Sequence, residues 1–104
     1  MKLFHTNVIL QDKAKDLKPA YSIGVDPVLT LEDAFKIIER FIKSDDVICC
    51  SAYIMEEDRD TKTRRIVYAR NYVCIIGTYY PDVRNYEGIY FDIKEEMKRY
   101  GEEV

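Results

Sequence analysis

The stretch from residue 31 to residue 43 constrains the fold most, because its apolar residues recur at the spacing of one helical face. Charged residues fill most of the other positions. Thr30 precedes the stretch and Asp33 follows three residues later, which is a variant of the capping box found at helix starts. The pattern predicts a helix over residues 31–43 with three buried side chains, Phe35, Ile38 and Phe41.

Segments typical of β-strands lie on both sides of this helix. Residues 2–10 are rich in β-branched and aromatic types and predict a first strand. Residues 11–29 contain Pro19, Gly24 and Pro27 and allow at most a short strand around residues 21–25. From Val47 to Met55 both alternating sets of residues are apolar or small, which predicts a central strand covered on both faces.

The second half of the chain contains further β-prone sequence and a second helix. The polar run at residues 56–63 predicts an exposed hairpin loop. The β-prone run that follows is too long for one strand, so we expect two strands, over residues 65–69 and 72–79. Asp92 and Glu95 favour a helix start, and the helix over residues 93–100 has an apolar stripe formed by Ile93, Met97 and Tyr100.

This order of elements contains no alternating strand–helix series that would favour a parallel sheet. We therefore expect an α+β fold, with a mainly antiparallel β-sheet of about 4–5 strands and two amphipathic helices packed on one face. A length of 104 residues suits one domain, which we assign to residues 1–104.

Charge and cysteine content bear on the surroundings of the protein. The formal net charge of −3 does not favour binding to a phosphate backbone. Neighbouring Cys49 and Cys50 would point to opposite faces of a strand, and with Cys74 the cysteine count is odd, so we expect free thiols. We also find no apolar run of membrane-spanning length and no signal-peptide core. These features predict a cytoplasmic protein that is not bound to a membrane.

The inventory of reactive side chains is small. His5 is the only histidine, and the adjacent cysteine pair lacks the two-residue gap of a structural zinc site. The acidic run at residues 56–60 lacks the ordered spacing of a calcium loop, and the glycines are too scattered for a phosphate-binding loop. We assign no catalytic residue, metal ligand or cofactor, and expect a non-enzymatic protein.

Tyrosine is the unusual feature of the composition, with nine tyrosines and no tryptophan. Several surround a polar turn near Pro81, where they offer contact area at low entropic cost. The leading hypothesis is a small acidic protein-binding domain, such as an inhibitor, an immunity-type protein or a regulatory protein, whose partner is another protein or a second copy. The candidate contact residues are Tyr79, Tyr80, Arg84, Tyr86 and Tyr90.

A second hypothesis follows from a resemblance. Residues 3–8 (LFHTNV) are similar to the first-strand motif of the RNA-recognition motif, and residues 58–65 (DRDTKTRR) resemble the charged loop before its central strand. The resemblance implies that single-stranded RNA stacks on Phe4 and Tyr72. This alternative site consists of Phe4, Arg65, Tyr68, Arg70 and Tyr72, with Arg64 beside them.

A third hypothesis is a pocket at one end of the sheet that binds a small ligand or performs catalysis of unknown chemistry. Its candidate residues are His5, Tyr53 and Arg70, chosen by residue type.

Overall fold

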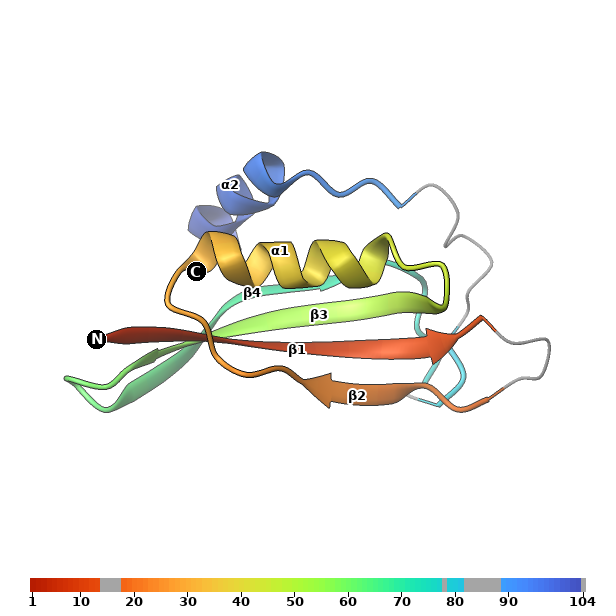
Figure 1. Ribbon diagram of the computed structural model, residues 1–104, viewed down its shortest axis with the longest axis horizontal. Coiled ribbons are helices and arrows are strands. Elements are labelled where there is room, and N and C mark those ends of the chain that lie inside the picture. Colours follow the sequence, from red (N-terminus) through yellow and green to blue (C-terminus); the bar gives the residue numbers. More distant parts are fainter. Residues whose placement is uncertain (14–17, 78, 82–88, 104) are drawn as a thin grey trace.

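Four antiparallel strands form one sheet in the order β2-β1-β3-β4. The computed structural model describes residues 1–13, 18–77, 79–81 and 89–103 (Figure 1). The strands are β1 (Lys2–Asp12), β2 (Tyr21–Gly24), β3 (Val47–Asp58) and β4 (Thr63–Asn71). The helices are α1 (Leu31–Ile42) and α2 (Ile93–Glu103), so the predicted α+β class with an antiparallel sheet is confirmed.

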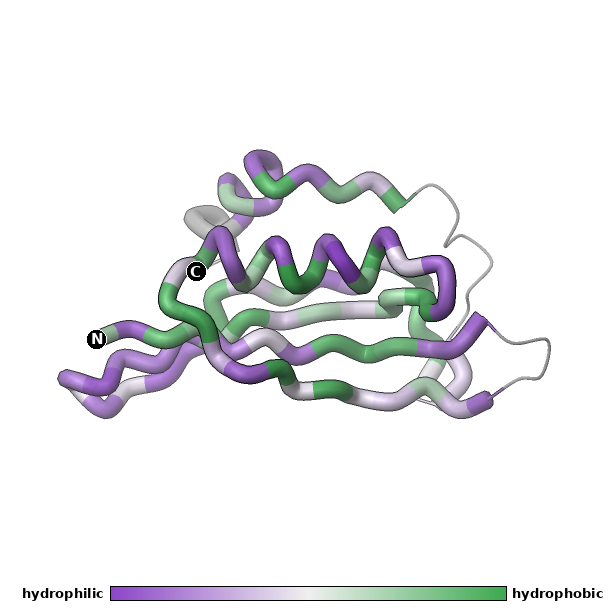
Figure 2. Tube along the Cα trace, viewed as in Figure 1, coloured by the Kyte–Doolittle hydropathy of each residue, from purple (hydrophilic) through white to green (hydrophobic). Residues whose placement is uncertain are grey.

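Helix α1 begins where the sequence predicts. The Thr30 hydroxyl accepts a hydrogen bond from the Asp33 backbone N–H at 3.1 Å, which satisfies one free donor of the first turn. Phe35 and Ile38 are buried, as expected, whereas Phe41 is only partly buried. In Figure 2 the hydrophobic positions of α1 lie mostly on the side of the helix nearer the sheet, and most hydrophilic positions lie on the far side.

Both helices lie on the same side of the sheet in Figure 1. Helix α1 packs against β1 and β3, while α2 packs against β4 and α1. The main core fills the space between these layers. Its buried residues are Phe4, Val8, Leu10, Ala34, Phe35, Ile38, Cys49, Ala52, Ile54, Val67, Tyr68 and Phe91.

Strand β3 lies between β1 and β4, which confirms its central position. Both faces are covered only over its first part, because Tyr53 of the predicted apolar set is 40% exposed. Cys49 belongs to the core beneath the helices, whereas Cys50 packs with Ile48 and Val73 in a second cluster. The register shifts here, because Ile9 faces Ser51 while Leu10 faces Cys49. Cys50 is therefore the extra residue of a β-bulge.

Among the described residues, no strand forms over the expected residues 72–79, and the sheet has four strands. The backbone N–H groups of Tyr72 and Val73 both donate to the carbonyl of Cys50, at 2.8 and 3.3 Å, and this takes the chain out of the ladder. Val73 and Ile75 then pack against the second cluster. Their apolar character serves to cover the end of the sheet rather than to extend it.

The hairpin loop is shorter than the predicted residues 56–63, because β3 continues to Asp58 and β4 begins at Thr63. Glu56 faces Arg65 and Glu57 faces Arg64 across the ladder, and both pairs form ion pairs. Opposite charges on facing strand positions stabilise a sheet, which explains why this polar sequence is extended. The remaining four-residue turn contains Lys62, whose φ of 57° is left-handed.

Helix α2 contacts the sheet through a carboxylate. The Asp92 side chain accepts a hydrogen bond from the Glu95 N–H at 3.2 Å, as the sequence predicts for this start. The expected apolar stripe is only partly correct, because Ile93 packs on the core whereas Met97 is exposed. Glu96 is the residue that is buried instead. Within the described residues, no helix is long and apolar enough to cross a membrane.

Candidate functional site

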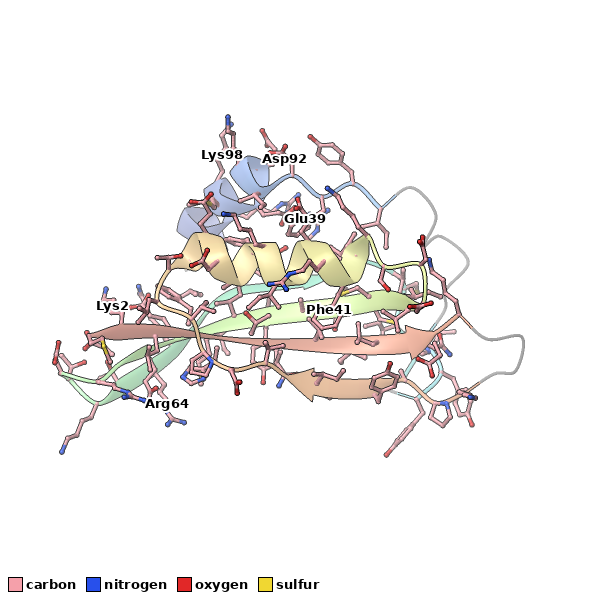
Figure 3. The ribbon with its side chains drawn as sticks, in the orientation of Figure 1. Lys2, Glu39, Phe41, Arg64, Asp92 and Lys98 are labelled. Carbon is pink, nitrogen blue, oxygen red and sulfur yellow. The ribbon has the colours of Figure 1, made fainter. Side chains whose placement is uncertain are left out.

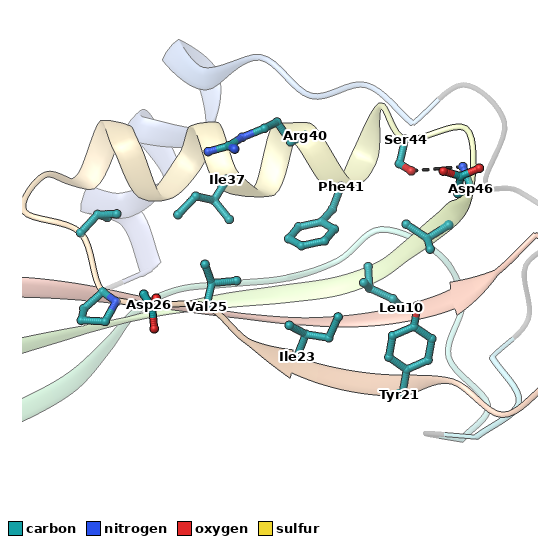
Figure 4. Close-up of a pocket in the computed structure, with 13 residues that line it drawn as sticks. Leu10, Tyr21, Ile23, Val25, Asp26, Ile37, Arg40, Phe41, Ser44 and Asp46 are labelled. Atoms are coloured by element: carbon teal, nitrogen blue, oxygen red, sulfur yellow. Dashed lines mark hydrogen bonds between the residues drawn. The ribbon is translucent and has the colours of Figure 1, made fainter.

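An apolar groove of about 620 Å³ lies between α1 and the edge strand β2 (Figure 4). We call it the α1–β2 groove. Its lining residues are Leu10, Tyr21, Ile23, Val25, Asp26, Pro27, Val28, Ile37, Arg40, Phe41, Ser44, Asp46 and Val47. This volume lies in the range of about 300–1,000 Å³ that is typical of binding sites, and the predominantly apolar lining is typical as well.

The groove exists because α1 does not cover the whole sheet. In the described part of the chain α1 packs on β1 and β3 but not on β2. After β2 the chain continues antiparallel beside β1, and Val28 exchanges two backbone hydrogen bonds with Phe4 at 2.8 and 3.0 Å. This segment lines one end of the groove and leads directly to the start of α1 at Thr30.

Charged and polar groups are placed at the rim of the groove. Arg40 extends from α1 above Ile37, while Asp26 and Asp46 lie toward opposite ends (Figure 4). The Ser44 hydroxyl accepts a hydrogen bond from the Asp46 N–H at 3.1 Å. Arg40 is thus the one cation among the lining residues, and it stands over an apolar floor.

Sequence reasoning did not single out any residue of the groove as a site residue. Phe41 was expected in the core, but Figure 3 and Figure 4 show its side chain pointing from α1 toward the sheet, where it lines the groove. Ile37 is not among the residues of α1 that were expected to be buried. Together these two residues make the apolar face of the helix wider than its contact with β1 and β3 requires, and this width is a signal that could have indicated a groove.

The predicted tyrosine site is only partly described. Tyr79, Tyr80 and Tyr90 are 64%, 57% and 69% exposed, while Arg84 and Tyr86 lie outside the described residues. The Tyr79 carbonyl accepts a hydrogen bond from the N–H of Ala20, just before β2. Tyr90 lies in the segment that runs along the helix side of the sheet in Figure 1. Of the three described tyrosines, Tyr79 is hydrogen-bonded through its backbone to the residue before β2.

The aromatic residues of the RNA-binding alternative lie beneath the helices. Phe4 and Tyr68 are buried in the main core, and Tyr72 is partly buried against it. Phe35 contacts Tyr68 edge-on, with ring centroids 4.9 Å apart. The expected exposed stacking platform is therefore not provided by Phe4 and Tyr68, because the apolar residues of β1 and β4 are needed to pack the helices.

The arginines of that alternative form ion pairs with carboxylates. Arg64 pairs with Glu57 at 3.1 Å and Arg65 with Glu56 at 3.4 Å. Arg70 pairs with Glu96.

Glu96 of α2 forms a polar cluster with Tyr68 of β4 and with Tyr72, which follows β4. The Tyr68 hydroxyl donates to Glu96 and lies 2.9 Å from the Tyr72 hydroxyl. Burial, the hydrogen bond to Glu96 and its negative charge raise the pKa of Tyr68. Burial also raises the pKa of Tyr72, with a further contribution from Tyr68. These contacts join α2 to β4 and hold the helix on the sheet.

The three residues of the pocket hypothesis are not brought together. His5 faces Met55 and Tyr53 faces Asn7, which places both on the side of the sheet opposite the helices. Arg70 faces Ala52, a core residue beneath the helices. The His5 ring nitrogen Nε2 lies 2.9 Å from Glu57 Oε1, and this hydrogen bond lowers the pKa of Glu57.

The two thiols of β3 offer little reactivity. Burial raises the pKa of Cys49 to about 12 and that of Cys50 to about 11, which keeps both protonated at neutral pH. Cys74 is exposed. In the part of the chain that the structure describes, no three His, Cys, Asp or Glu residues are grouped so as to hold a metal ion.

Comparison with known proteins adds no relative: no family model, no curated protein and no solved structure matches this chain.

Proposed function

We propose that this protein is a non-catalytic binding domain that acts by holding another protein in the α1–β2 groove, as an inhibitor, an immunity-type protein or a regulatory protein would. The observation that carries the proposal is the groove itself, which is open, mainly apolar and about 620 Å³ in volume. Exposed apolar surfaces of this kind mark interaction sites in proteins that are otherwise well packed.

Two further features support the proposal. Tyr21 is an exposed wall residue of the groove, and the backbone of Tyr79 is hydrogen-bonded to the neighbouring Ala20 at 2.7 Å. Exposed tyrosines next to an apolar site are typical of protein interfaces. The free thiols of Cys49, Cys50 and Cys74 support a reducing compartment, and we place the protein in the cytoplasm.

The experiment is a quantitative co-purification from the native host with the wild-type chain, Phe41→Lys and Lys36→Glu. Phe41 lines the groove, whereas Lys36 is an exposed residue of the same helix and is absent from the lining. We expect the specifically retained protein to be lost with Phe41→Lys and kept with Lys36→Glu. Circular dichroism must show that Phe41→Lys is folded at the working temperature. Retention of the same protein by a folded Phe41→Lys chain would exclude the groove as its binding site.

A small apolar ligand is the second candidate occupant, and the groove volume favours it because it lies within the range of ligand sites. Native mass spectrometry of the purified protein separates the two proposals. A bound molecule of defined small mass that is lost in Phe41→Lys would replace the protein partner.

A further inference from the structure

We infer that the occupant of the α1–β2 groove is an extended peptide segment that joins the sheet as a strand beside β2, with apolar side chains at alternate positions and a carboxylate facing Arg40. This inference rests on the proposed binding function and adds the mode of binding and the chemical class of the partner.

The free edge of β2 provides the backbone groups for such a strand. The N–H of Val25 donates inward to the Thr6 carbonyl at 3.0 Å. Because successive residues of a strand alternate in direction, the N–H and C=O groups of Ser22 and Gly24 point outward. Both residues are exposed, and among the described residues no strand pairs with this edge. Up to four backbone hydrogen bonds are therefore available.

The same edge already accepts one backbone partner. The N–H of Ala20, two residues before Ser22, donates to the Tyr79 carbonyl at 2.7 Å. A backbone partner can therefore approach this side of β2 without a steric clash. The hydrogen bond at Ala20 lies just before Ser22 and Gly24, whose outward groups are available.

The other edge of the sheet is protected against strand addition, and β2 is not. Strand β4 carries Arg64, Arg65 and Arg70, and its register shifts at Val67, which is the extra residue of a bulge. Charges and bulges are the usual devices that prevent pairing at an edge. The β2 sequence Tyr-Ser-Ile-Gly carries no charge. The contrast identifies β2 as the edge that is free to accept a strand.

The groove lies where the side chains of an added strand would point. Tyr21 and Ile23 of β2 line the groove, so a neighbouring strand would direct every second side chain to the same side, against Ile37 and Phe41. Main-chain bonds at the edge would supply affinity, and the groove would select apolar residues at alternate positions.

The positive charge of Arg40 at the groove indicates that the partner segment carries a carboxylate. Lys36 of α1 and Lys43, the residue that follows the helix, each pair with a glutamate four residues earlier, at 3.8 and 3.5 Å. Arg40, on the same helix, has no ion-pair partner among the described residues and extends over the groove (Figure 4). A carboxylate of the partner segment would pair with this guanidinium.

The test begins with a displayed library of random decapeptides as the probe. We expect enriched sequences with apolar residues at every second position and an aspartate or glutamate in place of one of them, because only these alternate positions face the groove and Arg40. Failure to enrich any peptide, or enrichment of apolar residues at helical spacing, would overturn the inference.

The best enriched peptide is then added to isotope-labelled protein, and amide exchange is followed by NMR. We expect the amides of Ser22 and Gly24 to exchange at least about tenfold more slowly, while the outer amides of β4 are unchanged. A copy of the peptide with methylated backbone nitrogens on the side that faces β2 should bind at least about tenfold more weakly. Binding that Phe41→Lys blocks but that leaves Ser22 and Gly24 unprotected would refute strand addition and leave the proposed function standing.

A charge exchange tests the role of Arg40. Arg40→Glu should weaken binding of the carboxylate-bearing peptide by about fivefold, and the variant should bind a lysine-bearing version of the peptide more tightly than the carboxylate-bearing one. Lys36→Glu should still bind the carboxylate-bearing peptide more tightly. Equal effects of the two variants would overturn the assignment of Arg40. Protection of Ser22 and Gly24 that rises with protein concentration in the absence of peptide would show that the occupant is a second copy of this chain, and would also overturn the inference.

Discussion

Replacing Glu96 by alanine should release α2 from the sheet. Among the described side chains of α2, Glu96 is the only buried one, and it is 1% exposed. Its carboxylate accepts a hydrogen bond from the Tyr68 hydroxyl, forms an ion pair with Arg70 and lies 3.8 Å from the Arg99 guanidinium. Among the described side chains of α2, this carboxylate and the partly buried side chain of Ile93 attach the helix.

The magnitude follows from what Glu96→Ala leaves behind. Removing one member of a buried ion pair costs about 3–5 kcal/mol, because the other charge stays in a low-dielectric site. The Arg70 side chain is 28% exposed, so water can solvate part of its guanidinium once the carboxylate is gone. We therefore expect the lower end, a loss of about 3 kcal/mol in the free energy of unfolding, or roughly 15 °C in Tm.

Urea denaturation followed by circular dichroism measures this loss, and Glu95→Ala is the matched control. Glu95 is an exposed neighbour whose salt bridge to Lys98 at 3.4 Å is worth at most about 1 kcal/mol. Hydrogen exchange should show α2 as the first element to open in Glu96→Ala. If both variants unfolded at the same urea concentration, the buried carboxylate would not be what holds α2 in place.

Two further predictions concern protonation. Iodoacetamide at pH 8 should modify Cys74 alone in the native protein, because burial raises the pKa of Cys49 to about 12 and that of Cys50 to about 11; rapid modification of either by mass spectrometry would contradict their burial. Since burial raises the pKa of Tyr68 and Tyr72 in the folded state, their contribution to stability is complete below about pH 10 and is lost as the pH rises above it. A Tyr72→Phe chain should lose less stability than the wild type between pH 9 and pH 11 in thermal melts, and equal losses would refute this.

The sequence predicts the elements whose signals are local. The 3.6-residue period and the Thr30 cap place α1 within one residue of its C-terminal end, and the two-sided apolar pattern identifies β3 as the central strand. The short strand at residues 21–24 lies where the glycine and prolines allow at most a short strand, but these residues do not themselves predict one.

The features that the sequence leaves open depend on residues far apart in the chain. Glu56 and Glu96 are buried although their residue type predicts exposure, because arginines on β4 reach them. The bulges at Cys50 and Val67 depend on the register between strands, which no single segment determines. The α1–β2 groove depends on where α1 rests on the sheet, so local periodicity could place Phe41 on the apolar face but not beside an open strand.

The difference between the two sheet edges also limits how far this protein can assemble. A sheet that is open at both edges can add copies without end, as fibres do. Here two chains that paired through β2 would use the same edge on both partners, which is a closed two-fold arrangement. The edges left outside would be the two β4 strands, with their arginines and bulge. Pairing of this kind would stop at two copies, and a partner strand bound at β2 would prevent even that step.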